Sequence, residues 1–179
     1  MNRRMCVKIA RDVLAQLRLR RYKATPGIYV QIDSPELTSI INNKSCTEYD
    51  KTARESFKDF FKSSKKTTCQ VCAIGAAFVS LVNIENKCSV DEMCADKSMW
   101  ERLEKYFGSD NMDLMESAFE CYTTNNFSTP YEMQEVAAEW GSQYKNPTDR
   151  LRAIMLNVIR NKGDFKLPKK YLAKYMKGE

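Results

Sequence analysis

The chain has 179 residues, a length typical of one domain that buries a core without disulfide support. Its 43% hydrophobic and 29% charged residues are ordinary for a globular protein, and no apolar stretch reaches the roughly 18 residues of a membrane-spanning helix. It contains no histidine, so it lacks the usual general base near neutral pH, the histidine-dependent catalytic triads and the commonest metal ligand. We therefore expect a binding protein without a cofactor, and not an enzyme.

Charge is unevenly distributed along the chain, whose net charge is +6. Residues 1–25 carry eight Lys and Arg against one acidic residue, and residues 150–179 carry nine against two. The middle, residues 26–149, carries twelve against twenty. This arrangement is typical either of a protein with a polyanionic partner or of a fold in which basic ends pack beside an acidic middle.

The first predicted element is a helix over residues 3–22. Its apolar side chains recur at helical spacing and form one face: Cys6, Ile9, Ala10, Val13 and Leu17. Arg4, Lys8, Arg11 and Arg18 fall on the opposite face.

A short strand is predicted after this helix, which Thr25-Pro26-Gly27 ends. Residues 27–32 alternate between the two faces as the residues of a strand do. The best pairing partner for the strand over residues 27–32 is the segment 67–71, so we expect a small two-stranded β ribbon.

A central helix is predicted over about residues 71–84, after helices that begin at Ser34 and span 47–62. This segment is apolar on nearly all sides, which is typical of a buried helix. Gly75 inside it costs up to about 1 kcal/mol relative to alanine, which indicates a packing reason for the glycine. The side chains expected to be fully buried are Ile74, Ala77, Phe78 and Leu81.

Four further helices are expected, each with a recognisable start or end. Ser98 and Glu101 cap one that stops at Gly108, and the next runs from Asp110 to Tyr122. The third follows a capping box at Thr129 and Glu132, and the fourth begins at Asn146-Pro147 and ends at Gly163. The elements together predict a mainly α single domain over residues 1–179, a helical bundle around the central helix with a basic C-terminal tail over 164–179.

Seven cysteines are present, and we expect most of them to be buried thiols of a reducing compartment. The N-terminus carries charge without a following apolar segment, which argues against a signal peptide and favours the cytoplasm. Cys69 and Cys72 have the spacing of a zinc-binding pair, but Cys88 and Cys94 are separated by five residues instead of two. Two roles for these four cysteines therefore stay open, zinc binding and simple packing in the core, and core packing is favoured.

Basic side chains interleaved with Tyr and Phe are suited to phosphates and bases. The candidate contacts for nucleic acid or another partner are Arg4, Lys8, Arg11, Arg18, Arg21, Lys169, Lys170 and Lys174. The alternative is that these basic side chains only form the solvent-exposed faces of their helices. Trp140, Tyr144 and the aromatic tail can likewise anchor a partner or pack on their own domain.

Three segments of the chain are relevant to a likeness with known proteins: Pro26-Gly27-Ile28-Tyr29, Cys69-Gln70-Val71-Cys72-Ala73-Ile74-Gly75-Ala76 and Asp149-Arg150-Leu151-Arg152-Ala153-Ile154-Met155. With the amphipathic first helix, they resemble a family of small bacteriophage proteins with a C-x-x-C-A-x-G-A helix and no assigned activity. The resemblance implies a protein in the cytoplasm of an infected bacterial cell that binds and inhibits a host protein or an anti-phage defence effector, such as a CRISPR complex. The alternative is a nucleic-acid-binding accessory protein. No membrane partner is expected, and the oligomeric state stays open.

Overall fold

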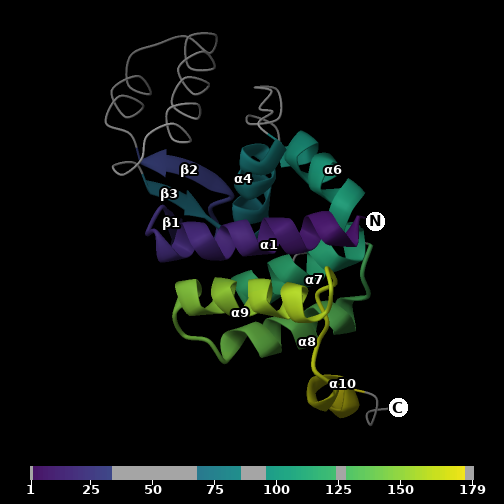
Figure 1. Ribbon diagram of the computed structural model, residues 1–179. Helices are drawn as coiled ribbons and strands as arrows, with labels where there is room; N and C mark the ends of the chain where they lie inside the picture. The colour runs from purple at the N-terminus through teal and green to yellow at the C-terminus, as the bar shows by residue number, and fades with distance from the viewer. Residues whose placement is uncertain (1, 34–67, 86–95, 124–127, 176–179) are drawn as a thin grey trace.

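The computed structural model describes residues 2–33, 68–85, 96–123 and 128–175. Within these ranges the chain is mainly α, as predicted, with seven helices and a three-stranded sheet (Figure 1). Their order is α1 (Arg3–Arg18), β1 (Tyr22–Ala24), β2 (Val30–Asp33), β3 (Thr68–Val71), α4 (Ala73–Glu85), α6 (Asp96–Phe107), α7 (Ser109–Glu120), α8 (Tyr131–Ser142), α9 (Pro147–Arg160) and α10 (Lys169–Tyr175). The helices predicted from Ser34 and over 47–62 lie outside the described residues. No helix in the described ranges combines the length and apolar character needed to cross a bilayer.

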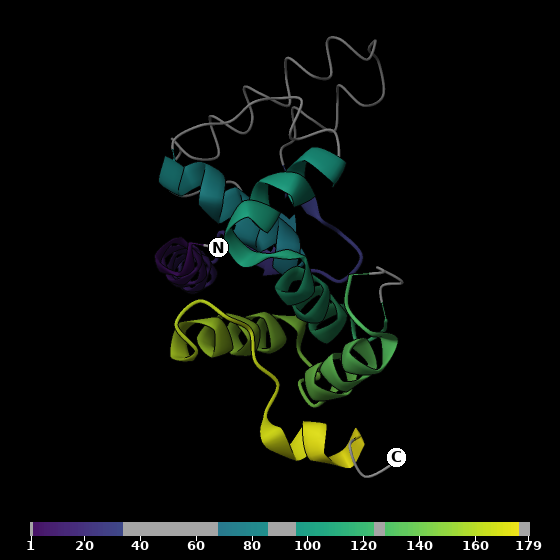
Figure 2. The same cartoon turned by 90° about the vertical axis from the view of Figure 1, so that its right-hand side faces the viewer.

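The central helix is α4, as its apolar sequence predicts. Every residue from Ala73 to Val82 is buried, and α4 packs against α1, α6, α7 and the strands β2 and β3. The four side chains predicted to be buried, Ile74, Ala77, Phe78 and Leu81, are each at most 1% exposed. Figures 1 and 2 show the sheet, α4 and α6 on one side of α1, with α8, α9 and α10 on the other. A single hydrophobic cluster connects the two sides.

The sheet has one strand more than predicted. β2 pairs with β3 in antiparallel register, with Val30 opposite Val71, so the predicted ribbon is present. β1 pairs in parallel with the other edge of β3, which makes β3 the central strand. The helix predicted over 3–22 is therefore wrong at its end: α1 stops at Arg18, and Arg20 takes a left-handed φ of 57° that turns the chain into β1.

Gly75 lies where α4 meets the backbone that leads into β2, which confirms the predicted packing reason. A Cβ atom at this position would lie 1.5 Å from the carbonyl oxygen of Tyr29. The amide of Cys72 donates a hydrogen bond of 2.6 Å to the carbonyl of Ile28, which holds the same segment against the start of α4. Only a residue without a side chain allows this approach.

Two predicted helix caps are wrong and one is confirmed. Pro130 is the N-cap of α8, because the Thr129 hydroxyl faces the Asp110 carboxylate at 3.4 Å instead of the helix amides. Ser98 lies inside α6, which already begins at Asp96. Asn146 does cap α9, since its side-chain oxygen accepts a hydrogen bond from the Thr148 amide at 2.8 Å.

Candidate functional site

The two basic ends of the chain lie side by side. α1 packs along α9, and the segment after α9 returns to the start of α1 (Figure 1). A Cβ atom on Gly163 would lie 2.7 Å from the Arg3 carbonyl oxygen, and Arg3 forms an ion pair of 3.2 Å with Asp164. The end of α9 therefore meets the beginning of α1, so the two helices run antiparallel and share one surface.

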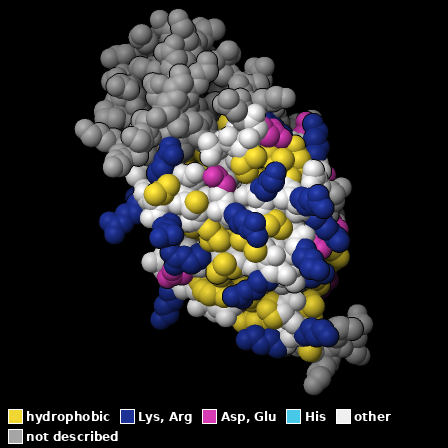
Figure 3. All heavy atoms as spheres, in the orientation of Figure 1, with side chains coloured by type: hydrophobic (Ala, Val, Ile, Leu, Met, Phe, Trp, Pro, Cys, Tyr) yellow, Lys and Arg dark blue, Asp and Glu magenta, His cyan; other side chains and the backbone are white. Residues whose placement is uncertain are grey.

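This shared surface is rich in cations, and we refer to it as the basic face. It consists of exposed side chains on α1, on α9 and in the segment that follows α9: Arg3, Arg4, Lys8, Arg11, Arg18, Arg152, Arg160, Lys162 and Lys166. Figure 3 shows Lys and Arg side chains gathered over α1 and α9, with few Asp and Glu between them. Cations concentrated in this way create a positive potential that attracts polyanions.

Apart from Arg3, which pairs with Asp164, the exposed cations along α1 do not help to hold the fold together. Arg4, Lys8, Arg11 and Arg18 form no ion pair with any other side chain in the described ranges. On α9, Arg152 does pair with Asp149 at 2.6 Å, but both side chains are exposed and such a pair contributes only about 0–1 kcal/mol. The four cations of α1 that have no ion pair within the described residues are thus fully available to a partner, whereas Arg3 and Lys166 on the basic face share the carboxylate of Asp164.

The structure divides the predicted contact residues. Those of α1 are exposed on the basic face, whereas Arg21 is half-buried beyond the end of α1. Lys169 and Lys170 are exposed on α10, and Lys174 belongs to the same helix. The sequence reasoning missed the arginines of α9. In the sequence, Arg152 and Arg160 can be recognised only as residues on the polar face of a helix whose apolar face was assigned to the core. The sequence does not show that this helix lies beside α1.

The segment after α9 packs on its own core, one of the two alternatives for the tail. Phe165 is 3% exposed, and its ring lies edge-on to Trp140 with 5.2 Å between centroids. The Asn111 side chain accepts a hydrogen bond of 2.9 Å from the Phe165 amide. The Asn157 side chain bonds both the amide and the carbonyl of Lys166, each at 2.8 Å. These bonds fix the position from which α10 begins.

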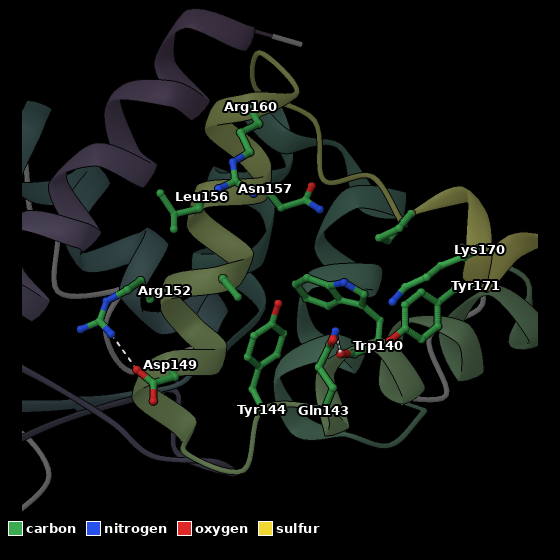
Figure 4. A pocket seen from close by; sticks show the side chains of 12 residues that line it. Trp140, Gln143, Tyr144, Asp149, Arg152, Leu156, Asn157, Arg160, Lys170 and Tyr171 are labelled. Carbon is green, nitrogen blue, oxygen red and sulfur yellow. Dashed lines mark hydrogen bonds and ion pairs between the residues drawn. The ribbon is translucent and has the colours of Figure 1, made fainter.

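A pocket of about 520 Å³ opens between the end of α8, α9 and α10 (Figure 4). Three aromatic residues line it, namely Trp140, Tyr144 and Tyr171, together with three cations, Arg152, Arg160 and Lys170. The remaining lining residues are Gln143, Asp149, Ala153, Leu156, Asn157 and Pro168. Since Arg152 and Arg160 also belong to the basic face, the pocket opens at its edge.

Cys69 and Cys72, the candidate zinc pair, lie in the core as free thiols that are at most 2% exposed. The Gly75 amide donates to the Cys72 sulfur at 3.4 Å, and burial raises the pKa of the Cys72 thiol to about 12. Cys88 and Cys94, the other two candidates, lie outside the described residues. Within the described ranges, no three acidic, Cys or His side chains are grouped as a metal ion requires. The described pair therefore fits core packing.

Alkylation of the folded protein tests this placement. Iodoacetamide at about pH 8 should leave Cys69 and Cys72 unmodified, because both sulfurs are shielded in the core and burial also disfavours the reactive thiolate of Cys72. Peptide mass spectrometry should show half-buried Cys121 modified before Cys69 and Cys72, and all three of these described thiols modified in denaturant. Rapid modification of Cys72 in the native state would contradict the buried placement. The zinc content of the purified protein tests the metal separately.

Comparison with known protein families, curated proteins and solved structures found no match to this chain. The resemblance to bacteriophage proteins consequently remains a prediction, and the function has to be argued from the chemistry of the site. That chemistry consists of a surface of exposed cations, most of them without an ion pair among the described residues, beside a pocket lined by aromatic rings.

Proposed function

We propose that the protein is a non-enzymatic binding protein that holds nucleic acid on the basic face. The observation that carries this proposal is the packing of α1 along α9, which unites cations from both ends of the chain on one surface. Contacts between such cations and phosphates release bound counterions, and this release supplies most of the sequence-independent affinity for nucleic acid.

The row of cations on α1 has dimensions suited to a phosphate backbone. Arg4, Lys8, Arg11 and Arg18 are all exposed on this helix. At 1.5 Å of rise per residue the row extends over about 21 Å. B-DNA carries one negative charge per about 1.7 Å of its axis, so the row lies alongside several phosphates at once.

Removing three of these charges should weaken the binding of nucleic acid strongly. The combined substitution Lys8→Gln, Arg11→Gln and Arg18→Gln is expected to lower the affinity for a labelled duplex by about tenfold or more at roughly 0.1 M salt, since each lost phosphate contact lowers the affinity. Fluorescence anisotropy measures this. The melting temperature should change little, because the three side chains are exposed.

A matched control separates the basic face from overall charge. Lys105 is an exposed lysine on α6, outside the basic face, so Lys105→Gln removes the same charge as Lys8→Gln. Only Lys8→Gln should weaken binding measurably. Equal effects of the two single variants, or a triple variant that binds like the wild type, would contradict the proposal.

A second candidate is the inhibition of a host protein or an anti-phage defence effector, such as a CRISPR complex, inside an infected bacterium. The mixture of aromatic and arginine side chains at the pocket favours it, because these residue types carry most of the binding energy in protein interfaces. A pull-down from bacterial lysate with and without nuclease distinguishes the two. A partner protein retained after nuclease treatment supports inhibition, and one lost with the nucleic acid supports the first proposal.

A further inference from the structure

We infer that the protein prefers single-stranded nucleic acid, and that the pocket between α8, α9 and α10 holds one unpaired base of the strand. This inference rests on the proposed function and adds to it the type of strand that is bound. The basic face alone attracts any polyanion, so the preference has to come from the aromatic residues beside it.

The aromatic residues that line the pocket are held in fixed positions, and two of them, Tyr144 and Tyr171, leave part of their rings accessible. Trp140 is 5% exposed and is held edge-on by Tyr144 and Phe165, with ring centroids 5.4 and 5.2 Å away. Figure 4 shows Trp140 and Tyr144 on the α8 side of the pocket and Tyr171 on the α10 side. Tyr144 and Tyr171 are half-buried, which leaves part of each ring accessible. Aromatic rings of this kind stack with any base, because every base has a flat π face.

Three cations line the pocket and are available to the phosphates of a strand whose base occupies it. Arg152 and Arg160 connect the pocket to the basic face, and the ammonium group of Lys170 lies 4.9 Å from the centroid of the Tyr171 ring. Asp149 is the one carboxylate that lines the pocket within the described residues, and its charge is balanced by Arg152 at 2.6 Å. The pocket is thus complementary to a base attached to an anionic backbone.

A base can enter this pocket only when it is unpaired. In a duplex the faces of each base are covered by its neighbours, and flipping one base out costs several kcal/mol. The volume of about 520 Å³ falls in the range of roughly 300–1,000 Å³ that is typical of small-molecule sites, which accommodates a base with its sugar. A duplex should therefore contact the basic face alone, whereas a single strand should contact both.

The fluorescence of Trp140 reports directly on occupation of the pocket. The chain has two tryptophans, so Trp100→Phe leaves Trp140 as the single emitter. A thymidine oligomer of about twelve nucleotides should quench this emission saturably, since stacking on the aromatic residues alters the surroundings of the indole. A duplex at the same phosphate concentration should not. Binding of the oligomer by anisotropy without quenching would overturn the inference.

Substitution of Tyr171 tests the preference for single strands. Tyr171→Ala should lower the affinity for the thymidine oligomer about tenfold and leave duplex affinity within about twofold, because the stacking contact is lost and the phosphate contacts stay. Tyr171→Phe should retain wild-type affinity for both ligands. Tyr131→Ala is the matched control, because Tyr131 is an exposed tyrosine on α8 outside the pocket lining.

The outcomes separate this inference from the function on which it rests. Selective loss of single-strand affinity in Tyr171→Ala supports it. Equal loss for both ligands, or no loss for either, overturns the inference while the binding of duplex by the basic face stands. If the wild-type protein binds neither ligand, the proposed function and the inference both fail.

Discussion

Replacing Phe78 by alanine should lower the free energy of unfolding by about 3–5 kcal/mol, the range observed when a buried phenylalanine is truncated. Phe78 is 1% exposed and lies in α4, which is surrounded by α1, α6 and α7. Because α4 has neighbours on all these sides, the surrounding helices cannot close the resulting cavity without losing contacts elsewhere. Native proteins of this kind are stable by only about 5–15 kcal/mol, so the loss should be evident as a much lower urea midpoint.

A control for this substitution is available on the surface. Tyr131 is 54% exposed on α8, and Tyr131→Ala should change the stability by no more than about 0.5 kcal/mol, as is usual at exposed positions. The two variants remove aromatic rings of similar size. An unchanged urea midpoint in Phe78→Ala would mean that α4 is peripheral, contrary to the structure.

Gly75→Ala should also destabilise the protein, by about 1–3 kcal/mol, the usual cost of forcing extra atoms into a packed core. Helix propensity alone predicts that Gly75→Ala stabilises the protein, since alanine is about 1 kcal/mol more favourable than glycine inside a helix. The added Cβ atom would lie 1.5 Å from the Tyr29 carbonyl oxygen, and a backbone atom cannot rotate aside as a flexible side chain does. The segment that carries Tyr29 is also fastened by the hydrogen bond from Cys72 to Ile28.

Thermal or urea unfolding of Gly75→Ala decides between these two signs. Ser142→Ala places an alanine at an exposed position of α8 and should leave the stability within about 0.5 kcal/mol. A Gly75→Ala variant that is more stable than the wild type would show that α4 does not approach the backbone before β2 as closely as described.

Elements with strong local patterns could be predicted from the sequence, and elements decided by distant contacts could not. The apolar run around Phe78 predicts α4 because a helix without a polar face has to be buried. β1 was missed because Tyr22 follows a helical pattern without a break, and the strand depends on pairing with β3 and on the bond between the Tyr22 and Ser80 hydroxyls at 3.1 Å. Thr129 has the spacing of a cap, but its contact with Asp110 on α7 prevails.

The candidate site divides in the same way. The row on α1 could be predicted, because Lys8 and its neighbours recur on one face of an amphipathic helix. Trp140 and Tyr144 could be recognised as candidate anchors, but the pocket that unites them with α10 depends on the docking of Phe165. The contribution of Arg160 depends on the antiparallel packing of α9 against α1, which no local pattern encodes.

The salt dependence of nucleic-acid affinity tests the basic face most directly. For the wild-type protein, the logarithm of the association constant should fall linearly with the logarithm of salt concentration, with a slope of about −0.9 for each phosphate contacted in a duplex. The combined Lys8→Gln, Arg11→Gln and Arg18→Gln substitution should reduce the magnitude of this slope by about 2–3, whereas Lys105→Gln should leave it unchanged. An affinity that does not respond to salt, or equal slopes for the triple variant and the wild type, would contradict the account.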